Sequence, residues 1–154
     1  MSDRHEEALK EYLLLMKMDP TKAQYVYKAG ELFEERDNAQ RAVEFYRKAI
    51  EIDPKHFDSH YRLGRSLYRG KHSIEAKLEL EQAIEGGTSR NHAFYYLGRI
   101  LKENRDYVAA LLAFEKSQRE EELKVKSLVE RGSCYMSLNS LDRAVVESSN
   151  AQSA

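Results

Sequence analysis

The sequence lacks the features that would indicate disulfide bonding, secretion or membrane insertion. Cys134 is the only cysteine among 154 residues, so no internal disulfide can form, and this favours a reducing compartment. There is no apolar run of about 18 residues, and the N-terminus lacks the pattern of a signal peptide. These absences predict a cytoplasmic protein that does not enter a membrane.

The chain also lacks an excess of charge of either sign. It has 25 lysines and arginines against 26 aspartates and glutamates, which gives a formal net charge of -1. A balanced chain has no global field that attracts nucleic acid or an anionic membrane. Nucleic-acid binding is therefore not favoured, and we expect partner choice to depend on local patches.

Groups of residues that carry out catalysis or bind metals are missing as well. The five histidines are dispersed, and His56 with His60 is the only pair at helical ligand spacing. His56 is expected to precede a helix and His60 to lie at a packing position. There is no phosphate-binding glycine loop, and Ser66 near His60 is no assembled nucleophile and base. We expect no catalytic residue, no metal and no cofactor.

The sequence does contain an internal repeat with a fixed period. Four of the seven glycines are spaced by 34 residues, and an alanine follows each of them after twelve residues. Such self-similarity is typical of arrays in which one small unit stacks on the next. The positions in this register are Gly30, Gly64, Gly98 and Gly132, followed by Ala42, Ala76, Ala110 and Ala144.

Each copy is predicted to form two helices of about 14 residues joined by a tight turn. A glycine in the middle of the first helix destabilises it by about 1 kcal/mol relative to alanine. We expect close approach of the second helix to compensate, with its alanine opposite the glycine. Large residues recur around both small sites, at Phe33, Leu67, Leu101 and Tyr135 and at Tyr46, Leu80 and Phe114.

This pattern resembles the tetratricopeptide repeats. Their run of bulky residue, Leu-Gly, bulky residue, Ala, aromatic and Ala is matched by Leu63-Gly64, Leu67, Ala76, Leu80 and Ala83. Arg131 and Ser148 depart from it and weaken the last copy most. The resemblance covers essentially the whole chain. It implies an all-α fold, a right-handed α-solenoid of antiparallel helix pairs with about three full repeats and partial repeats at both ends.

The register divides the chain into copies of a single domain, 1–154. A partial repeat with a second helix only is expected at 1–20, full repeats at 23–56, 57–90 and 91–124, and a weak terminal repeat at 125–154. Asn38, Ser73 and Asp106 are predicted to cap the second helices. Residues Ser117 to Lys126 could continue as helix, so this junction is expected to be longer or less regular than the others.

The first helices of such an array line its inner surface, and this is where we expect a ligand. Tyrosine and arginine, which interfaces favour, gather there. The first full copy is acidic on the same surface, with Glu31, Glu34 and Glu35. The predicted peptide-binding residues are Tyr61, Arg62, Arg65, Tyr68, Arg69, Tyr95, Tyr96, Arg99 and Lys102.

The leading hypothesis is a non-catalytic scaffold that binds a peptide or protein segment, acidic or carboxylate-bearing, in this Tyr/Arg groove. One subset of the family grips chaperone tails with a defined set of Lys, Asn and Arg. The two corresponding windows here do not match it, and chaperone-tail binding of that type is not expected. The windows are Tyr27, Glu31, Arg62, His92 and Tyr96, then Tyr61, Arg65, Tyr96, Lys126 and Glu130.

Two alternatives stay open. The apolar residues Leu9, Leu13 and Met16 of the unmatched N-terminal helix, or the uncapped C-terminal end, could build a homo-oligomer by end-to-end stacking. RNA binding, as in helical arrays that contact one base per repeat, is ranked last because the net charge is near zero.

Overall fold

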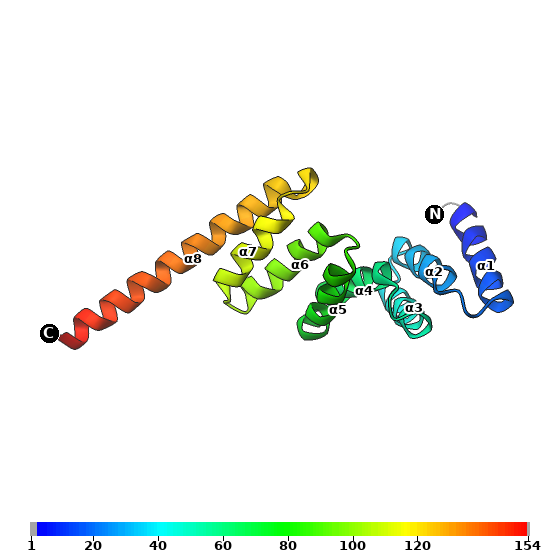
Figure 1. Ribbon diagram of the computed structural model, residues 1–154, viewed down its shortest axis with the longest axis horizontal. Coiled ribbons are helices and arrows are strands. Elements are labelled where there is room, and N and C mark those ends of the chain that lie inside the picture. Colours follow the sequence, from blue (N-terminus) through cyan, green and yellow to red (C-terminus); the bar gives the residue numbers. More distant parts are fainter. Residues whose placement is uncertain (1–2, 154) are drawn as a thin grey trace. The chain divides into compact units, whose positions relative to one another are not determined.

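The computed structural model describes residues 3–153, and these fold entirely into α-helices and short turns (Figure 1). The helices are α1 (Asp3–Met18), α2 (Ala23–Glu35), α3 (Ala39–Ile52), α4 (Phe57–Arg69), α5 (Ser73–Gly86), α6 (Arg90–Glu103), α7 (Tyr107–Ser117) and α8 (Glu121–Ser153). The chain divides into two units, Met1–Ser89 and Arg90–Ala154. Each unit is an array of packed helices, as expected for an all-α solenoid.

The helices follow the 34-residue period. The first helices α2 and α4 begin at Ala23 and Phe57, and the second helices α3, α5 and α7 begin at Ala39, Ser73 and Tyr107. Within the first unit, α2 pairs with α3 and α4 with α5, while α1 packs on α2. In the second unit, α6 pairs with α7, and α8 packs mainly on α7.

Close approach at the helical glycines is confirmed in three copies. A Cβ atom built on Gly30 would lie 2.8 Å from Cε1 of Tyr46, and one on Gly64 would lie 2.8 Å from Cγ of Leu80. At Gly98 the neighbour is Cε1 of Phe114, at 2.7 Å. The large side chain four residues after each alanine therefore fills the space that the glycine leaves. The alanines themselves, Ala42, Ala76 and Ala110, are fully buried.

The turns inside these copies share one backbone geometry. The residue seven places after each glycine has a positive φ, with 56° at Asp37, 67° at Lys71 and 63° at Arg105. This left-handed conformation ends the first helix and reverses the chain within a few residues.

The predicted caps are correct in two copies and wrong in one. Asn38 and Asp106 precede α3 and α7, and their side chains accept hydrogen bonds from the backbone N–H groups of Arg41 (3.2 Å) and Ala109 (3.3 Å). In the middle copy the cap position belongs to His72, which makes no such bond, and Ser73 is the first helical residue. The N-cap position of α5 is therefore His72, one residue before the predicted Ser73.

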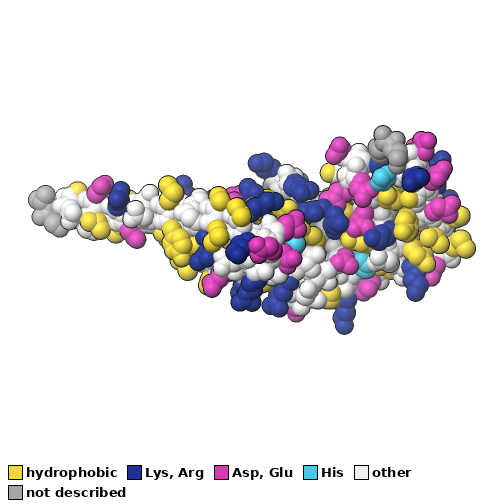
Figure 2. All heavy atoms as spheres, turned by 90° about the horizontal axis from the view of Figure 1, so that it is seen from above, with side chains coloured by type: hydrophobic (Ala, Val, Ile, Leu, Met, Phe, Trp, Pro, Cys, Tyr) yellow, Lys and Arg dark blue, Asp and Glu magenta, His cyan; other side chains and the backbone are white. Residues whose placement is uncertain are grey.

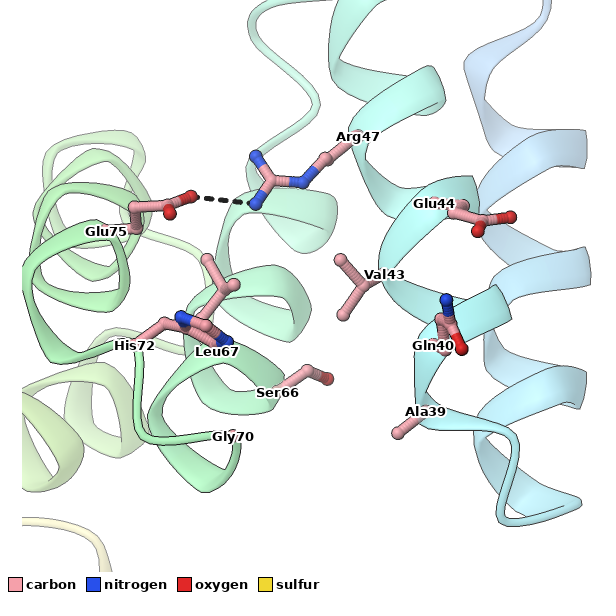
Figure 3. A pocket seen from close by; sticks show the side chains of 10 residues that line it. All are labelled: Ala39, Gln40, Val43, Glu44, Arg47, Ser66, Leu67, Gly70, His72 and Glu75. Atoms are coloured by element: carbon pink, nitrogen blue, oxygen red, sulfur yellow. Dashed lines mark hydrogen bonds and ion pairs between the residues drawn. The ribbon is translucent and has the colours of Figure 1, made fainter.

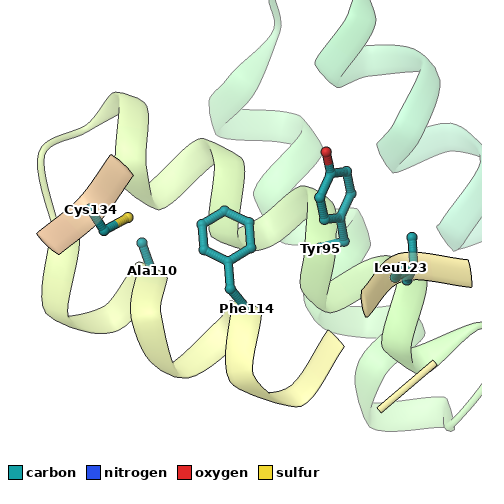
Figure 4. Close-up of a cluster of buried hydrophobic side chains, with 5 residues drawn as sticks. All are labelled: Tyr95, Ala110, Phe114, Leu123 and Cys134. Carbon is teal, nitrogen blue, oxygen red and sulfur yellow. The ribbon is translucent and has the colours of Figure 1, made fainter. Parts of the chain in front are cut away.

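The second unit has its own core, drawn in Figure 4. Tyr95 of α6, Ala110 and Phe114 of α7, and Leu123 and Cys134 of α8 form a buried apolar cluster. Cys134 is a fully buried free thiol, as expected for a small core side chain. A buried hydrogen bond of 2.7 Å between the hydroxyls of Ser117 and Ser127 also joins α7 to α8.

The junction between α7 and α8 corrects one expectation. The chain does not continue as helix through Ser117 to Lys126, because α7 ends at Ser117 and α8 begins at Glu121. The intervening turn is closed by a 3.1 Å hydrogen bond from the Glu120 N–H to the Ser117 carbonyl. The junction is short and regular, like the one between α5 and α6.

Helix α8 differs from the preceding pairs because it runs for 33 residues without a turn. A Cβ atom on Gly132 would meet nothing within 4 Å, and Ala144 is exposed. The large residue that covers the glycine elsewhere is replaced by Ser148. Apolar side chains therefore remain on the surface of α8 (Figure 2), namely Val125, Leu128, Val129, Tyr135, Met136, Leu141, Val145 and Val146.

No helix in the described part of the chain combines the length and apolar character needed to cross a membrane.

Candidate ligand-binding surface

Glu31 and Glu34 of α2 face a row of arginines on α4. The arginines Arg62, Arg65 and Arg69 are three and four residues apart, so they project from one side of the helix. We call Lys28, Glu31, Glu34, Arg62, Arg65 and Arg69 the α2–α4 charged cluster.

The contacts inside this cluster are short and converge on the two carboxylates. Arg62 donates one hydrogen bond to Glu31 Oε1 at 3.0 Å and another to Glu34 Oε2 at 3.3 Å. Arg65 donates to Glu34 Oε1, and Nη1 of Arg69 lies 3.7 Å from the same oxygen. Three cations of α4 are thus oriented by carboxylates of the preceding repeat.

Two tyrosine hydroxyls and a lysine complete the coordination of these carboxylates. Tyr27 donates to Glu31 at 2.7 Å, and Lys28 donates to the other oxygen of Glu31 at 2.7 Å. Tyr46 of α3 donates to Glu34 at 2.7 Å. The same Tyr46 packs on Gly30, so one side chain serves both the core and the charged cluster.

These hydrogen bonds keep the carboxylates ionised. Burial opposes ionisation of Glu34, but the hydrogen bonds from Tyr46 and Arg65 outweigh it and the pKa of Glu34 is lowered. The pKa of Glu31 is lowered in the same way, against burial, by Lys28 and Tyr27. Burial and the hydrogen bond to Glu34 raise the pKa of Tyr46, so its hydroxyl remains a neutral donor.

The charged cluster retains a positive excess after this pairing. It contains four cationic and two anionic side chains, which leaves a formal charge of +2. The side chain of Arg69 is 59% exposed and that of Arg65 is 17% exposed. The guanidinium of Arg65 lies 5.7 Å from the centre of the Tyr61 ring, a cation–π distance. Arg69 is therefore the most accessible cation of the cluster.

The structure separates the sequence-predicted tyrosines into buried and accessible ones. Tyr61 and Tyr95 are 7% and 8% exposed, and Tyr95 belongs to the core of the second unit. Tyr27 is 7% exposed, and all three residues lie three places before a glycine of the repeat. Recurrence of tyrosine at one register position was a sequence signal for packing. Tyr68 and Tyr96 are partly exposed.

Glu35, which we expected on the same surface, points elsewhere. Its carboxylate lies 2.8 Å from Nε2 of His5 on α1 and is half exposed. It therefore links α2 to α1 and takes no part in the charged cluster.

The second unit has a smaller charged site of its own. Nζ of Lys102 lies 2.8 Å from Oε2 of Glu130 on α8, and Nε of Arg99 lies 3.9 Å from the other oxygen. The sequence did not indicate that Glu130 pairs with Lys102, because Glu130 lies on α8, in the copy that follows the one containing Lys102. The hollow here has a volume of about 140 Å³ and is lined by Arg99, Lys102, Glu103, Tyr107, Glu130 and Ser137.

A larger hollow that sequence reasoning missed lies among α3, α4 and α5 (Figure 3). Its volume is about 440 Å³, and a 2.8 Å ion pair between Arg47 and Glu75 spans it. Its lining comes from three helices, so no local motif marks it. The lining residues are Ala39, Gln40, Val43, Glu44, Arg47, Ser66, Leu67, Gly70, His72 and Glu75.

The histidine pair has structural partners. Nδ1 of His60 lies 2.6 Å from Oε2 of Glu79, and Nε2 lies 2.8 Å from the carbonyl oxygen of Pro54. Nδ1 of His56 lies 2.7 Å from the Ser59 hydroxyl, and its Nε2 lies 2.8 Å from Oε1 of Gln24. Residues 3–153 contain no group of three or more His, Cys, Asp or Glu side chains that could hold a metal ion.

Models of one repeat family match the first unit. The tetratricopeptide repeat is found at residues 23–56 and again at 45–78. Residues 23–78 of this chain belong to the tetratricopeptide-repeat family. No curated protein matches its sequence.

Solved structures of tetratricopeptide-repeat proteins share the fold. MamA is 22% identical, with a TM-score of 0.79 over 92% of this chain and 78% of MamA. YrrB, described as having an unusual peptide-binding site, is 23% identical, with a TM-score of 0.76 over 88% of this chain and 70% of YrrB. The first tetratricopeptide-repeat domain of Spaghetti (RPAP3), bound to the HSP90 peptide SRMEEVD, is 17% identical. Its TM-score is 0.70 over 79% of this chain and 96% of that domain.

Proposed function

We propose that this tetratricopeptide-repeat protein is a non-catalytic scaffold that binds an acidic or carboxylate-bearing peptide or protein segment on the first-helix faces of its repeats. The observation that carries the proposal is the +2 excess of the charged cluster. The proposed contact residues are Arg62, Arg65, Tyr68 and Arg69 in the first unit and Tyr96, Arg99 and Lys102 in the second, with the buried Tyr61 and Tyr95 behind them.

The arginines of the charged cluster are preorganised for a second carboxylate. Each guanidinium has five N–H donors, and the bonds to Glu31 and Glu34 use only some of those on Arg62 and Arg65. Because the internal carboxylates already fix these side chains, a ligand would lose less side-chain entropy on binding them. Arg69 extends from the same helix face into solvent and would make the first contact. Tyr61 and Tyr95, both buried, would act by supporting their neighbours.

The names of two fold relatives support a peptide as the ligand. One is described with a peptide-binding site and the other was solved with a peptide that contains two glutamates and a terminal aspartate. The carboxylate-binding pattern of the chaperone-tail subset is absent here, so we propose that the charged cluster supplies the contacts instead.

The test is binding of fluorescent peptides by anisotropy. A peptide with two acidic residues and a free carboxylate is compared with the same peptide in amide form and with a neutral version. The protein variants are Arg69→Glu and, as a matched control, Arg41→Glu at an exposed position of α3. We expect Arg69→Glu to weaken binding of the acidic peptide about tenfold, and Arg41→Glu to leave it within about twofold. Equal affinity of the acidic and neutral peptides, or equal effects of the two reversals, would contradict the proposal.

A homo-oligomer through α1 is a second proposal. Leu9 is buried against α2, whereas Leu13 and Met16 line an apolar hollow of about 390 Å³ beside α2 and α3. This hollow favours a contact through Leu13 and Met16. Light scattering over a concentration series is expected to show a dimer in the wild type and a monomer after Leu13→Glu. A monomer at every wild-type concentration would exclude it.

A further inference from the structure

Helix α8 continues the repeat register without forming the helix pair that the register describes elsewhere. In the three complete copies, the glycine of the first helix touches a large side chain of the second, at 2.7 to 2.8 Å from a built Cβ atom. Gly132 has no such neighbour, and Ala144 is exposed where its three counterparts are fully buried. The two small residues that would allow a fourth pair are present on α8, but they do not approach a second helix.

The residues that make the turn in the complete copies have good counterparts inside α8. The seventh and eighth residues after Gly132 are Asn139 and Ser140. Asparagine is among the non-glycine residues that most readily adopt the left-handed conformation seen at Asp37, Lys71 and Arg105. Serine is a strong N-cap, like Asn38 and Asp106 in the complete copies. In the straight helix the Ser140 hydroxyl bonds to the Met136 carbonyl instead, at 3.0 Å. Turn-forming residues thus lie in the middle of a helix.

The exposed apolar side chains of α8 lie on more than one face. At about 100° per residue, Val146 follows Leu128 after five full turns and shares its face, whereas Leu141 lies on the face of the buried Leu123. In the complete copies, the face around the glycine packs on the second helix across the turn. A turn at Asn139 would bring the corresponding faces around Gly132 and Ala144 together.

We propose that α8 has a second conformation in which the chain turns at Asn139 and Ser140 and residues 141–153 fold back on residues 121–137 as a fourth antiparallel helix pair. Folding back covers Leu128, whose counterparts Val26, His60 and Phe94 are buried, and it places Ser148 opposite Gly132. It gives up the helical hydrogen bonds that cross the turn position. The occupant of the face around Gly132 is the chain's own C-terminal segment, because Asn139 and Ser140 stand where the complete copies turn and Ala144 stands at the register position of the buried alanines of their second helices.

The half of α8 before the turn is common to both conformations. It contains Leu123 and Cys134 of the second-unit core and Glu130, which pairs with Lys102. The change therefore leaves the core and the charged site of the second unit in place.

Disulfide trapping distinguishes the two conformations. In a Cys134→Ala background, the test pair is Tyr135→Cys with Glu147→Cys. Their counterparts three periods earlier, Phe33 and Phe45, have ring centres 5.0 Å apart across a helix pair. In a straight helix, twelve residues separate the two Cα atoms by about 18 Å, whereas a disulfide requires less than about 7 Å. The control pair, Ser133→Cys with Val145→Cys, has the same spacing. Its counterparts, Glu31 and Val43, lie in the charged cluster and in the hollow of Figure 3.

We expect an intramolecular disulfide in the test pair that forms at least about fivefold faster than in the control pair. Asn139→Ala with Ser140→Ala is expected to slow it about fivefold, which corresponds to the loss of one N-cap, and Asn139→Gly is expected to accelerate it. Equal rates in the two pairs, or no disulfide in the test pair, would overturn the proposal. A disulfide found only between two chains would also overturn it and would assign the face around Gly132 to a second copy.

Hydrogen exchange on the unsubstituted protein tests the same proposal without cysteine variants. In the complete copies the N–H of the residue eight places after the glycine bonds to the carbonyl five residues earlier, as from Asn38 to Phe33 at 2.9 Å. A hairpin therefore leaves the N–H groups of residues 141 and 142 without partners. We expect these amides to exchange faster than those on either side. Protection that falls steadily from residue 135 to the C-terminus would instead describe a straight helix that frays at its end.

Discussion

The complete helix pairs and α8 carry the same small residues at the same spacing, yet only the complete pairs close. In the pairs, the residue sixteen places after the glycine is Tyr46, Leu80 or Phe114, and each fills the space above its glycine. In α8 that residue is Ser148, which is exposed. Turn residues and small residues permit a pair, and a large side chain on the second helix stabilises it. Small residues therefore allow the two helices to approach closely, and the large side chain supplies the contact that stabilises this approach.

The largest expected effect is the difference in unfolding free energy between a substitution at Gly64, which a large side chain covers, and one at Gly132, which nothing covers. A Val side chain at Gly64 would meet Leu80, so we expect Gly64→Val to lower the free energy of unfolding by about 3 kcal/mol. Gly132→Val meets no neighbour and is expected to be neutral or stabilising by a few tenths of a kcal/mol. Urea unfolding measures both. Equal losses would mean that Gly132 is also covered in solution.

Supplying the missing large residue sharpens the comparison in the opposite direction. Ser148→Leu provides what Leu80 provides in the second full copy, and burial of a leucine side chain is worth about 2 kcal/mol. We expect the variant to increase disulfide trapping between positions 135 and 147 by about tenfold or more. The control is Ser149→Leu, at the neighbouring exposed position, which is expected to have little effect. An unchanged trapping rate in Ser148→Leu would show that the second helix lacks more than one side chain.

A smaller effect is expected where the core meets the charged cluster. Tyr46→Phe retains the ring that covers Gly30 and removes the hydroxyl that donates to Glu34. Loss of one hydrogen bond to a partly buried carboxylate is expected to lower the free energy of unfolding by about 1.5 kcal/mol. In the double variant with Glu34→Gln, the loss caused by Tyr46→Phe should shrink. Full additivity in this cycle would mean that the hydroxyl and the carboxylate do not interact.

The smallest effect is a dependence of stability on pH that arises from His60. Burial lowers its pKa, but the hydrogen bonds to Glu79 and to the Pro54 carbonyl raise the pKa by more, so the net shift is upward from 6.5. The stabilisation is therefore fully present below pH 6.5 and is lost as the pH rises through the folded-state pKa. His60→Phe, which introduces the residue found at Phe94 in the next copy, should remove this dependence between pH 6 and 8.5. A wild-type stability that rises with pH in this window would contradict the sign.

The free energy of unfolding measured at low pH tests the contribution of Glu31 and Glu34 in the charged cluster. Because Glu31 and Glu34 have lowered pKa values, their contribution is present above pH 4.5 and is lost as the pH falls through their folded-state values.

The sequence alone predicted the parts of the fold that depend on one period. The register located the turns and predicted close approach at Gly98, because the same small residues recur in every copy. It placed Ala110 opposite this glycine, whereas the side chain nearest to it is that of Phe114. It did not predict that Arg62 and Arg65 are paired with Glu31 and Glu34, since that contact joins neighbouring copies. The lining of the hollow in Figure 3 was missed for the same reason. The straight shape of α8 was not predicted, because the pattern of glycines and alanines continues there while the large residue of the other copies is replaced by Ser148.

Glu34 accepts hydrogen bonds from Tyr46 of its own repeat and from Arg62 and Arg65 of the next one. One carboxylate therefore couples the unfolding of two adjacent repeats, because opening either repeat leaves it without some of its donors. Repeat arrays lose cooperativity when such coupling between neighbours is weak. In the first unit, the residues proposed to bind a ligand would thus also determine whether α2 to α5 melt as one block or one pair at a time.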